Sequence, residues 1–217
     1  MHLKRNNIGK FWPVPRKGTK YLAVAMHNKK DSIPLIVIAR DLLKIVRNKK
    51  ELKRILNEKK IKINNKEIRE INYPVCLSDV VTLPDAGKNY RAILSKNKKM
   101  QIQEITDKEA ERKIFKVIGK KILAGKKIQL NLSHGVNILS KEKTNIGDSV
   151  ILSLKDKKII KIIKKEGGKK ALIIKGKHAG FSGKIEEIVY RGGKEIAKIT
   201  SDKGRINVWT KNLIITE

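Results

Sequence analysis

The sequence lacks the features that mark disulfide-bonded, zinc-binding, secreted and membrane-spanning proteins. It has one cysteine, Cys76, so it can form no internal disulfide and has no cysteine pair for a zinc finger or knuckle. Its longest apolar run, residues 33–39, is seven residues long, whereas a membrane helix needs roughly 20. No apolar stretch follows the basic N-terminus, so we expect neither secretion nor a membrane partner.

Acidic residues are also scarce relative to basic ones. Lys and Arg total 52 against 21 Asp and Glu, which gives a formal charge of +31. A chain with this charge repels itself and needs a polyanion, either nucleic acid or an anionic membrane surface. Aromatic residues make up only 4%, which predicts small aliphatic cores, but 40% hydrophobic residues are enough for folding. The composition therefore favours a cytoplasmic polyanion-binding protein.

The first 30 residues contain eight Lys or Arg and no acid. Prolines and glycines interrupt regular structure there, and few apolar residues cluster, so folding would not offset the entropy of ordering. We predict that residues 1–32 form an extended basic arm that is disordered alone and orders on RNA. A floppy tail without a binding role is the alternative, against which the aromatic residues argue. The candidate RNA contacts of the arm are Lys4, Arg5, Trp12, Arg16 and Lys17.

Residues 33–57 predict two helices. Pro34 falls in the first turn of the first, and apolar residues recur at helical spacing as far as Val46. Asn48 can cap the second, with Glu51 three residues later and Leu52, Ile55 and Leu56 as its buried stripe. For each basic residue outside the apolar stripes, a solvated side chain is as good an interpretation as an RNA contact. The candidate RNA surface is Arg40, Lys44, Arg47, Lys49, Lys50, Lys53 and Arg54.

Alternating patterns dominate the rest of the chain. A tight hairpin is predicted through Asn64-Asn65, followed by a strand over 79–83, so residues 33–86 form one small α+β domain. Further strands predict a central all-β domain over 87–166, with a brief helix from Thr106, and a small β-barrel over 167–217. The expected fold class is α+β with several domains. The expected strands after residue 86 cover 90–94, 100–105, 113–123, 127–132, 149–154, 159–163, 171–174, 184–190, 195–201 and 205–208.

The glycine-rich turn of the last domain is a further candidate RNA contact. Its glycines at 176, 180 and 183 would let a tight loop approach an RNA backbone, where Lys175, Lys177 and His178 present charge. The alternative is that the glycines serve only the geometry of a barrel turn. Trp209, in the last predicted strand, is expected to pack in the core rather than stack on a base.

No constellation of catalytic residues is present in the sequence. The nearest approach to a phosphate-binding Walker loop, residues 119–127, has the wrong spacing and lacks the final hydroxyl. Glu186 and Glu187 are neighbours in a predicted strand, so their side chains point to opposite faces. His134 lies in a turn, where a structural or RNA-contacting role is favoured. We therefore expect no enzyme activity, cofactor, metal site or small-molecule substrate.

Three stretches, taken in order, resemble the small-subunit ribosomal protein family S4e. Residues 2–5 and 12–17 are similar to its N-terminal segment. Residues 33–44, 62–66 and 73–74 resemble its RNA-binding domain of the S-four type, and residues 171–176, 180 and 183–185 resemble a KOW module. The resemblance implies a structural constituent of the small ribosomal subunit that binds and stabilises folded 16S-type rRNA and supports translation. It also implies ribosomal protein neighbours and no self-oligomer.

The sequence departs from this family at three points. Asn65 stands where the hairpin turn usually has Gly, but Asn tolerates the same backbone conformation. Cys76 also stands where Gly is usual, and a left-handed conformation there would cost about 1 kcal/mol. A buried, inert thiol is the favoured interpretation of Cys76. The chain ends soon after the KOW-like stretch, which fits an archaeal type best.

The balance of basic residues indicates how RNA would be recognised. Lys outnumbers Arg 42 to 10, and Lys is a mobile point charge that suits phosphates better than base edges. We therefore expect recognition mainly of RNA shape and backbone. The alternative function is a KOW-containing RNA-binding transcription or rRNA-processing factor. An RNA-modifying enzyme is disfavoured, because the central domain is too small for a catalytic domain.

Overall fold

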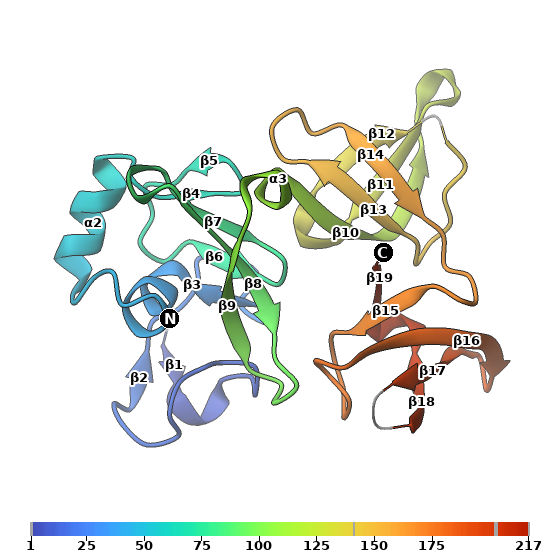
Figure 1. The fold of residues 1–217 in the computed structure, drawn as a ribbon, viewed down its shortest axis with the longest axis horizontal. Helices are drawn as coiled ribbons and strands as arrows, with labels where there is room; N and C mark the ends of the chain where they lie inside the picture. Colours follow the sequence, from blue (N-terminus) through green and yellow to red (C-terminus); the bar gives the residue numbers. More distant parts are fainter. Residues whose placement is uncertain (1, 141, 202–203, 217) are drawn as a thin grey trace. The chain divides into compact units, whose positions relative to one another are not determined.

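The computed structural model describes residues 2–140, 142–201 and 204–216, and the chain divides into two compact units, Met1–Lys113 and Ile114–Glu217 (Figure 1). Strands dominate both, and the few helices are short, so the mixed α and β character expected from the sequence is confirmed. Among the described residues, no helix is long and apolar enough to cross a membrane.

The N-terminal segment packs on the first unit, so the prediction of an extended arm is wrong. Strand β1 (Leu3–Lys4) pairs with β2 (Tyr21–Leu22), and the Phe11 carbonyl accepts a hydrogen bond of 2.8 Å from Met100 N. Trp12 is only 4% exposed and belongs to the core of this unit. The apolar residues of the segment are too dispersed to form a core alone, but a core built by later residues receives them. Those packed around it are Leu3, Ile8, Phe11, Val14, Leu22 and Ala23.

The first predicted helix is shorter than expected. Residues Ser32–Pro34 form strand β3, which pairs with β6 (Pro74–Cys76). Helix α1 (Leu35–Val37) follows and continues as a π-helix over Ile38–Leu42. Pro34 is extended, with ψ 142°, and therefore precedes the helix instead of lying in its first turn. The helix does not reach Val46, because the chain leaves helical geometry at Lys44, with φ 54°.

Helix α2 (Lys49–Asn57) agrees closely with the sequence prediction. The Asn48 side chain accepts a hydrogen bond of 2.9 Å from Glu51 N, which satisfies one of the free amides at the helix start. Leu52 and Leu56 are fully buried, while Ile55 is half-buried. The basic residues of the helix therefore face away from the core.

A five-stranded antiparallel sheet completes the first unit. Its strand order is β5-β4-β7-β8-β9, and the β4–β5 turn has positive φ at Asn64 and Asn65, as predicted. Because β7 pairs with β8, the sheet continues across the domain boundary expected after residue 86, and the compact unit ends at Lys113 instead. A 3₁₀ turn, Pro84–Ala86, joins β7 to β8, and α3 (Asp107–Ala110) begins with the capping box of Thr106 and Glu109. The strands are β4 (Lys62–Ile63), β5 (Lys66–Glu67), β7 (Val80–Leu83), β8 (Lys88–Leu94) and β9 (Met100–Ile105).

A buried carboxylate ties together three parts of this unit. Asp79 accepts hydrogen bonds from Cys76 N at 2.6 Å, from the Asn64 side chain at 2.7 Å and from the Lys113 ammonium group. Asn64 in turn accepts a bond of 3.0 Å from Val80 N. The side chains of Lys113 and Asp79 are 1% and 5% exposed, so water screens their pairing very little.

Cys76 has none of the strain considered for it, because it lies in β6 with ordinary extended geometry. The positive φ in this loop falls at Ser78, at 65°. Burial, together with the smaller effect of the nearby Asp79 charge, raises the pKa of the Cys76 thiol to about 12. Since the thiolate is the reactive form, the prediction of an inert thiol agrees with its surroundings.

The second unit contains two five-stranded antiparallel sheets. The first has the order β12-β11-β10-β13-β14 and the second the order β18-β17-β16-β15-β19. The short strands β12 and β19 were not predicted from the sequence. Two cores of mostly aliphatic side chains hold this unit together, as the low aromatic content indicated, and the core of the second sheet also includes Ile151 and Ile163 of the first. The strands are β10 (Arg112–Ile122), β11 (Ile128–Leu132), β12 (Asn137–Ser140), β13 (Ser149–Ser153), β14 (Ile159–Ile163), β15 (Lys170–Ile173), β16 (Ser182–Arg191), β17 (Lys194–Ser201), β18 (Gly204–Trp209) and β19 (Leu213–Thr216).

Candidate nucleic-acid interface

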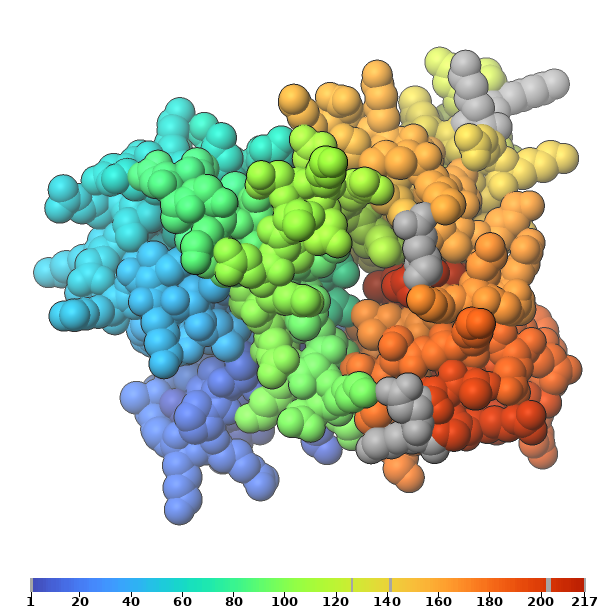
Figure 2. Space-filling view, in the orientation of Figure 1, coloured from blue at the N-terminus to red at the C-terminus, as the bar shows by residue number. Residues whose placement is uncertain are grey.

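Helix α2 presents several basic side chains to the solvent. Its buried side holds Leu52 and Leu56, so helical spacing leaves the basic side chains outside. The segment lies at the surface in Figure 2 (light blue). Glu58 forms a hydrogen-bonded ion pair of 3.0 Å with Arg54, leaving most of that guanidinium in water. The exposed basic residues of this surface, called the α2 surface below, are Lys49, Lys50, Lys53 and Arg54.

The other basic residues predicted near this helix do not form one helical flank. Lys44 and Arg47 lie in the loop between the π-helix and α2, because the first helix ends at Leu42. Arg40 forms two hydrogen bonds with Asp41, of 2.8 and 3.0 Å, which raise the pKa of its guanidinium. All three are exposed, and their contact with RNA stays a prediction.

In the N-terminal segment, two of the predicted RNA contacts, Trp12 and Arg5, make contacts within the protein instead. Trp12 is buried, so the prediction that it offers its ring to RNA is wrong. The Arg5 guanidinium donates to the carbonyls of Thr19 and Pro15, at 2.7 and 2.6 Å, and to the Thr19 hydroxyl at 2.9 Å. It thereby closes the loop between β1 and β2. Lys4, Arg16 and Lys17 are exposed and stay candidates.

The glycines of the turn before β16 are required by the geometry of the backbone. Gly176 and Gly180 have φ of 100° and 89°, a conformation that other residues rarely adopt. At Gly183 a Cβ atom would collide with the Thr200 carbonyl oxygen of the neighbouring strand, so this glycine serves sheet packing. Lys175 and Lys177 are exposed and His178 is half-buried, and their role in RNA binding stays a prediction.

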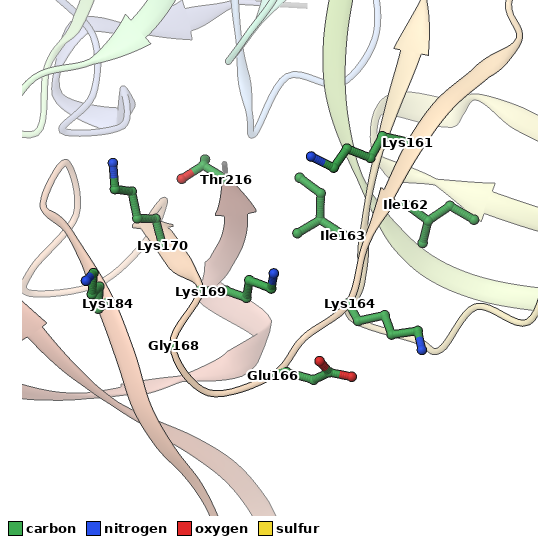
Figure 3. Close-up of a pocket in the computed structure, with 10 residues that line it drawn as sticks. All are labelled: Lys161, Ile162, Ile163, Lys164, Glu166, Gly168, Lys169, Lys170, Lys184 and Thr216. Atoms are coloured by element: carbon green, nitrogen blue, oxygen red, sulfur yellow. The ribbon is translucent and has the colours of Figure 1, made fainter.

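A lysine-lined groove that the sequence did not reveal lies in the second unit (Figure 3). It has a volume of about 510 Å³ and runs between β14 and β15, which belong to different sheets. Figure 3 shows Lys161 and Lys169 extending from opposite walls toward the space between them. The only signal in the sequence was the density of lysines on either side of Gly167-Gly168. The groove is lined by Lys161, Lys164, Lys169, Lys170 and Lys184, with Ile162, Ile163, Glu166, Gly168 and Thr216.

The charge of this groove suits an anion with several negative groups. Five lysines and one glutamate line it, so phosphates that repel one another in RNA would be neutralised together. Among the described residues, no group of three His, Cys, Asp or Glu side chains could hold a metal ion. The α2 surface and the groove are therefore two basic surfaces among the described residues.

One lysine of the second unit has a structural position instead. Lys116, on β10, donates from its ammonium group to the carbonyls of Thr210, Lys211 and Leu213, at 2.6, 3.0 and 2.8 Å. Burial, together with the smaller effect of the nearby positive charge of Lys165, lowers its pKa from 10.5 to about 8. Lys116 thus joins the first sheet of this unit to the turn that precedes β19.

We expect the stability contributed by Lys116 to rise with pH. Its pKa is lower in the folded chain than in the unfolded chain, so between about pH 8 and 10.5 the unfolded state binds more protons. Raising the pH through this window therefore favours folding at this site. Thermal unfolding of the wild type and of Lys116→Met, measured from pH 7 to 10, should show the wild type gaining stability relative to the variant. A difference that stays constant or falls would contradict this, and the exposed Lys177→Met serves as the control.

Comparisons with known proteins agree on one family. Residues 86–159 match the model of the ribosomal family S4e. The chain is 36% identical to the small ribosomal subunit protein eS4 of Methanocella arvoryzae over 190 residues, covering 86% of this chain and 80% of that protein. It is 38% identical to the eS4 protein of Methanospirillum hungatei over 192 residues, covering 86% of this chain and 79% of the relative.

A solved structure shows the same likeness at the level of the fold. The crystal structure of the 30S ribosomal protein S4e from Thermoplasma acidophilum superposes with a TM-score of 0.74 at 29% identity. The match covers 85% of this chain and 94% of the other. The sequence and fold comparisons therefore point to one family over most of the chain.

Proposed function

Because the chain belongs to the S4e family of ribosomal proteins, we propose that it binds folded small-subunit rRNA mainly through phosphate contacts made by its lysine-rich surfaces. Membership makes it a structural constituent of the small ribosomal subunit that associates with rRNA and ribosomal proteins. The prediction of a non-enzymatic protein is confirmed by this membership. The alternative of a transcription or processing factor is not favoured by relatives that are ribosomal proteins.

The observation that carries the proposed binding mode is the lysine-lined groove. Five lysines from the two sheets and the loop between them line one groove, although their like charges repel one another. An RNA backbone brings the compensating phosphates at a spacing that several lysines can share. The α2 surface adds four more exposed cations on a different unit. Both surfaces offer mobile point charges, which suit recognition of backbone and shape.

The finer domain assignment is part of the same proposal. We propose that the residues around α2 and the β4–β5 hairpin act as the S-four-type RNA-binding domain, and that β15–β19 act as the KOW module. Supporting this are the capped helix beside a hairpin in the first unit and the small antiparallel sheet with its glycine turn in the second. The sheet pairing of β8 and β9 with β7 enlarges the first domain beyond residue 86.

Sedimentation of the native protein tests the proposed function. In a lysate separated on a sucrose gradient at low salt, the full chain should travel with small ribosomal subunits. High salt should release it, because phosphate contacts weaken as counterions compete. Recovery only at the top of the gradient at low salt, or with RNA polymerase, would contradict the proposal and favour the alternative factor.

A further inference from the structure

Trp209 lies on the surface, contrary to the expectation that it packs in the core. Its side chain is 38% exposed, and it is absent from the core cluster of its sheet. Its strand neighbour Val208 belongs to that core. Because successive side chains of a strand alternate between faces, Trp209 points to the opposite, outer face of the sheet.

The indole stands at the end of an apolar row on this outer face. Trp209 is paired in register with Ile196 of β17, and Ile196 with Val189 of β16. Both neighbours are half-buried, so the row supports the ring from the side of the sheet. The patch is one residue wide on each strand, which fits a single flat ring better than a broad protein surface.

Two lysine ammonium groups lie close to the Trp209 ring. The ammonium groups of Lys194 and Lys211 lie 5.5 and 4.8 Å from its centroid. Arg191 is exposed and paired in register with Lys194, at the same end of the sheet. An exposed indole beside two positive charges, with a third at the same end of the sheet, matches the two parts of a nucleotide, a flat base and a phosphate. The lysines can move from the ring to the phosphate, because a cation on an exposed ring is held more weakly than a stacked base.

The backbone beside Trp209 is fixed in place. The Lys116 ammonium group holds the Thr210 and Lys211 carbonyls, and the Thr210 hydroxyl donates to Glu195 at 2.8 Å. Thr210 is itself buried. The position of the ring is therefore set before any ligand arrives, which lowers the entropy lost on binding.

We propose that Trp209 is a stacking platform for an unpaired base of the bound RNA, with Lys194 and Lys211 contacting the adjoining phosphates. This inference rests on the proposed rRNA-binding function and adds a site that reads single-stranded RNA. Charge complementarity favours RNA over a neighbouring protein as the occupant, because the apolar row is narrow and bordered by cations.

Fluorescence and binding measurements on the full chain test this inference. In a Trp12→Phe background, Trp209 is the only tryptophan, and a single-stranded eight-nucleotide oligouridylate should quench its emission. Trp209→Ala should weaken binding of this oligomer about tenfold, while Trp209→Phe should keep most of the affinity. Trp209→Ala should change the affinity for a duplex RNA less than twofold, because paired bases cannot stack on the ring. Tyr190→Ala is the matched control: this aromatic residue is 77% exposed and lies on the other face of the same sheet.

The outcomes separate this inference from the function on which it rests. If the wild-type chain binds RNA but the oligomer neither quenches Trp209 nor distinguishes Trp209→Ala, the stacking platform is wrong and the proposed function stands. If RNA leaves the emission unchanged but a tryptophan-free ribosomal protein shifts it, that protein occupies the row, and the inference is also wrong. If the wild type binds no RNA, both fail. The quenching arm needs no substitution at Trp209, so it decides the matter even if Trp209→Ala does not fold.

Discussion

Asp79→Ala is expected to lower the free energy of unfolding of the first unit by about 3–5 kcal/mol. The substitution leaves the Lys113 ammonium group buried at 1% exposure without its carboxylate partner, and removes the acceptor of Cys76 N and of the Asn64 side chain. Urea unfolding, followed by Trp12 fluorescence in a Trp209→Phe background, reports on this unit alone, because Trp12 lies in its core.

The exposed ion pair of Lys88 and Glu104, in the same unit, is the control for this prediction. Their side chains are well exposed, so Glu104→Ala should cost no more than about 1 kcal/mol. Equal effects of the two substitutions would contradict a structural role for the Asp79 network. Asp79→Asn, which keeps the shape but loses the charge, should fall between the wild type and Asp79→Ala.

Trp12→Ala is expected to destabilise the first unit by a similar amount, about 3–5 kcal/mol. A core indole of 4% exposure is removed, and the cavity lies where the N-terminal segment meets the rest of the unit. We expect the amides of Arg5 and Met100, which donate to the Lys20 and Phe11 carbonyls, to exchange much faster in the variant. Hydrogen exchange followed by mass spectrometry measures both effects on the RNA-free protein.

Tyr21→Ala provides a matched change in the same segment. Tyr21 is half-exposed, so its removal should alter stability by much less than removal of Trp12. If the amides of residues 2–22 exchange freely in the wild type without RNA, the segment is disordered alone, and the packing described above would be contradicted.

Features that depend on near neighbours were predictable from the sequence. The Asn48 cap, the positive φ at Asn64 and Asn65 and the capping box at Thr106 are each decided within three or four residues. The buried stripe of α2 follows from helical periodicity in the same way. For this reason α2 and the β4–β5 hairpin were located nearly to the residue.

Features that depend on distant residues were not predictable. Trp12 is buried by a core that residues 33–102 build, which no pattern within the first 30 residues could reveal. The lysine-lined groove forms only because β14 and β15 enter different sheets. Trp209 follows the core residue Val208 in its strand, and the alternation of side chains, applied strictly, could have placed it outside.

The domain boundary predicted after residue 86 differs from the observed one, at Lys113, for the same reason. The pattern changes from helical to alternating near Lys60, which led to a boundary after the first hairpin and strand. Strands β8 and β9 nevertheless extend the sheet that β4 and β7 begin. Pairing between strands is a tertiary choice, and alternation alone does not say which strand lies beside which.

The salt dependence of rRNA affinity tests most directly the claim that phosphate contacts at the groove carry binding. For the wild type, six to ten phosphate contacts predict a loss of about 10³–10⁵ in affinity between 50 and 200 mM salt. The variant in which Lys164, Lys169, Lys170 and Lys184 become Gln should bind more weakly, with a logarithmic slope shallower by about 3. The control variant carries Gln at Lys120, Lys121, Lys127 and Lys143, exposed lysines outside the groove, and has the same net charge. We predict that its slope stays within about 1 of the wild type; equal slopes for the two variants, or a flat wild-type affinity, would contradict the account.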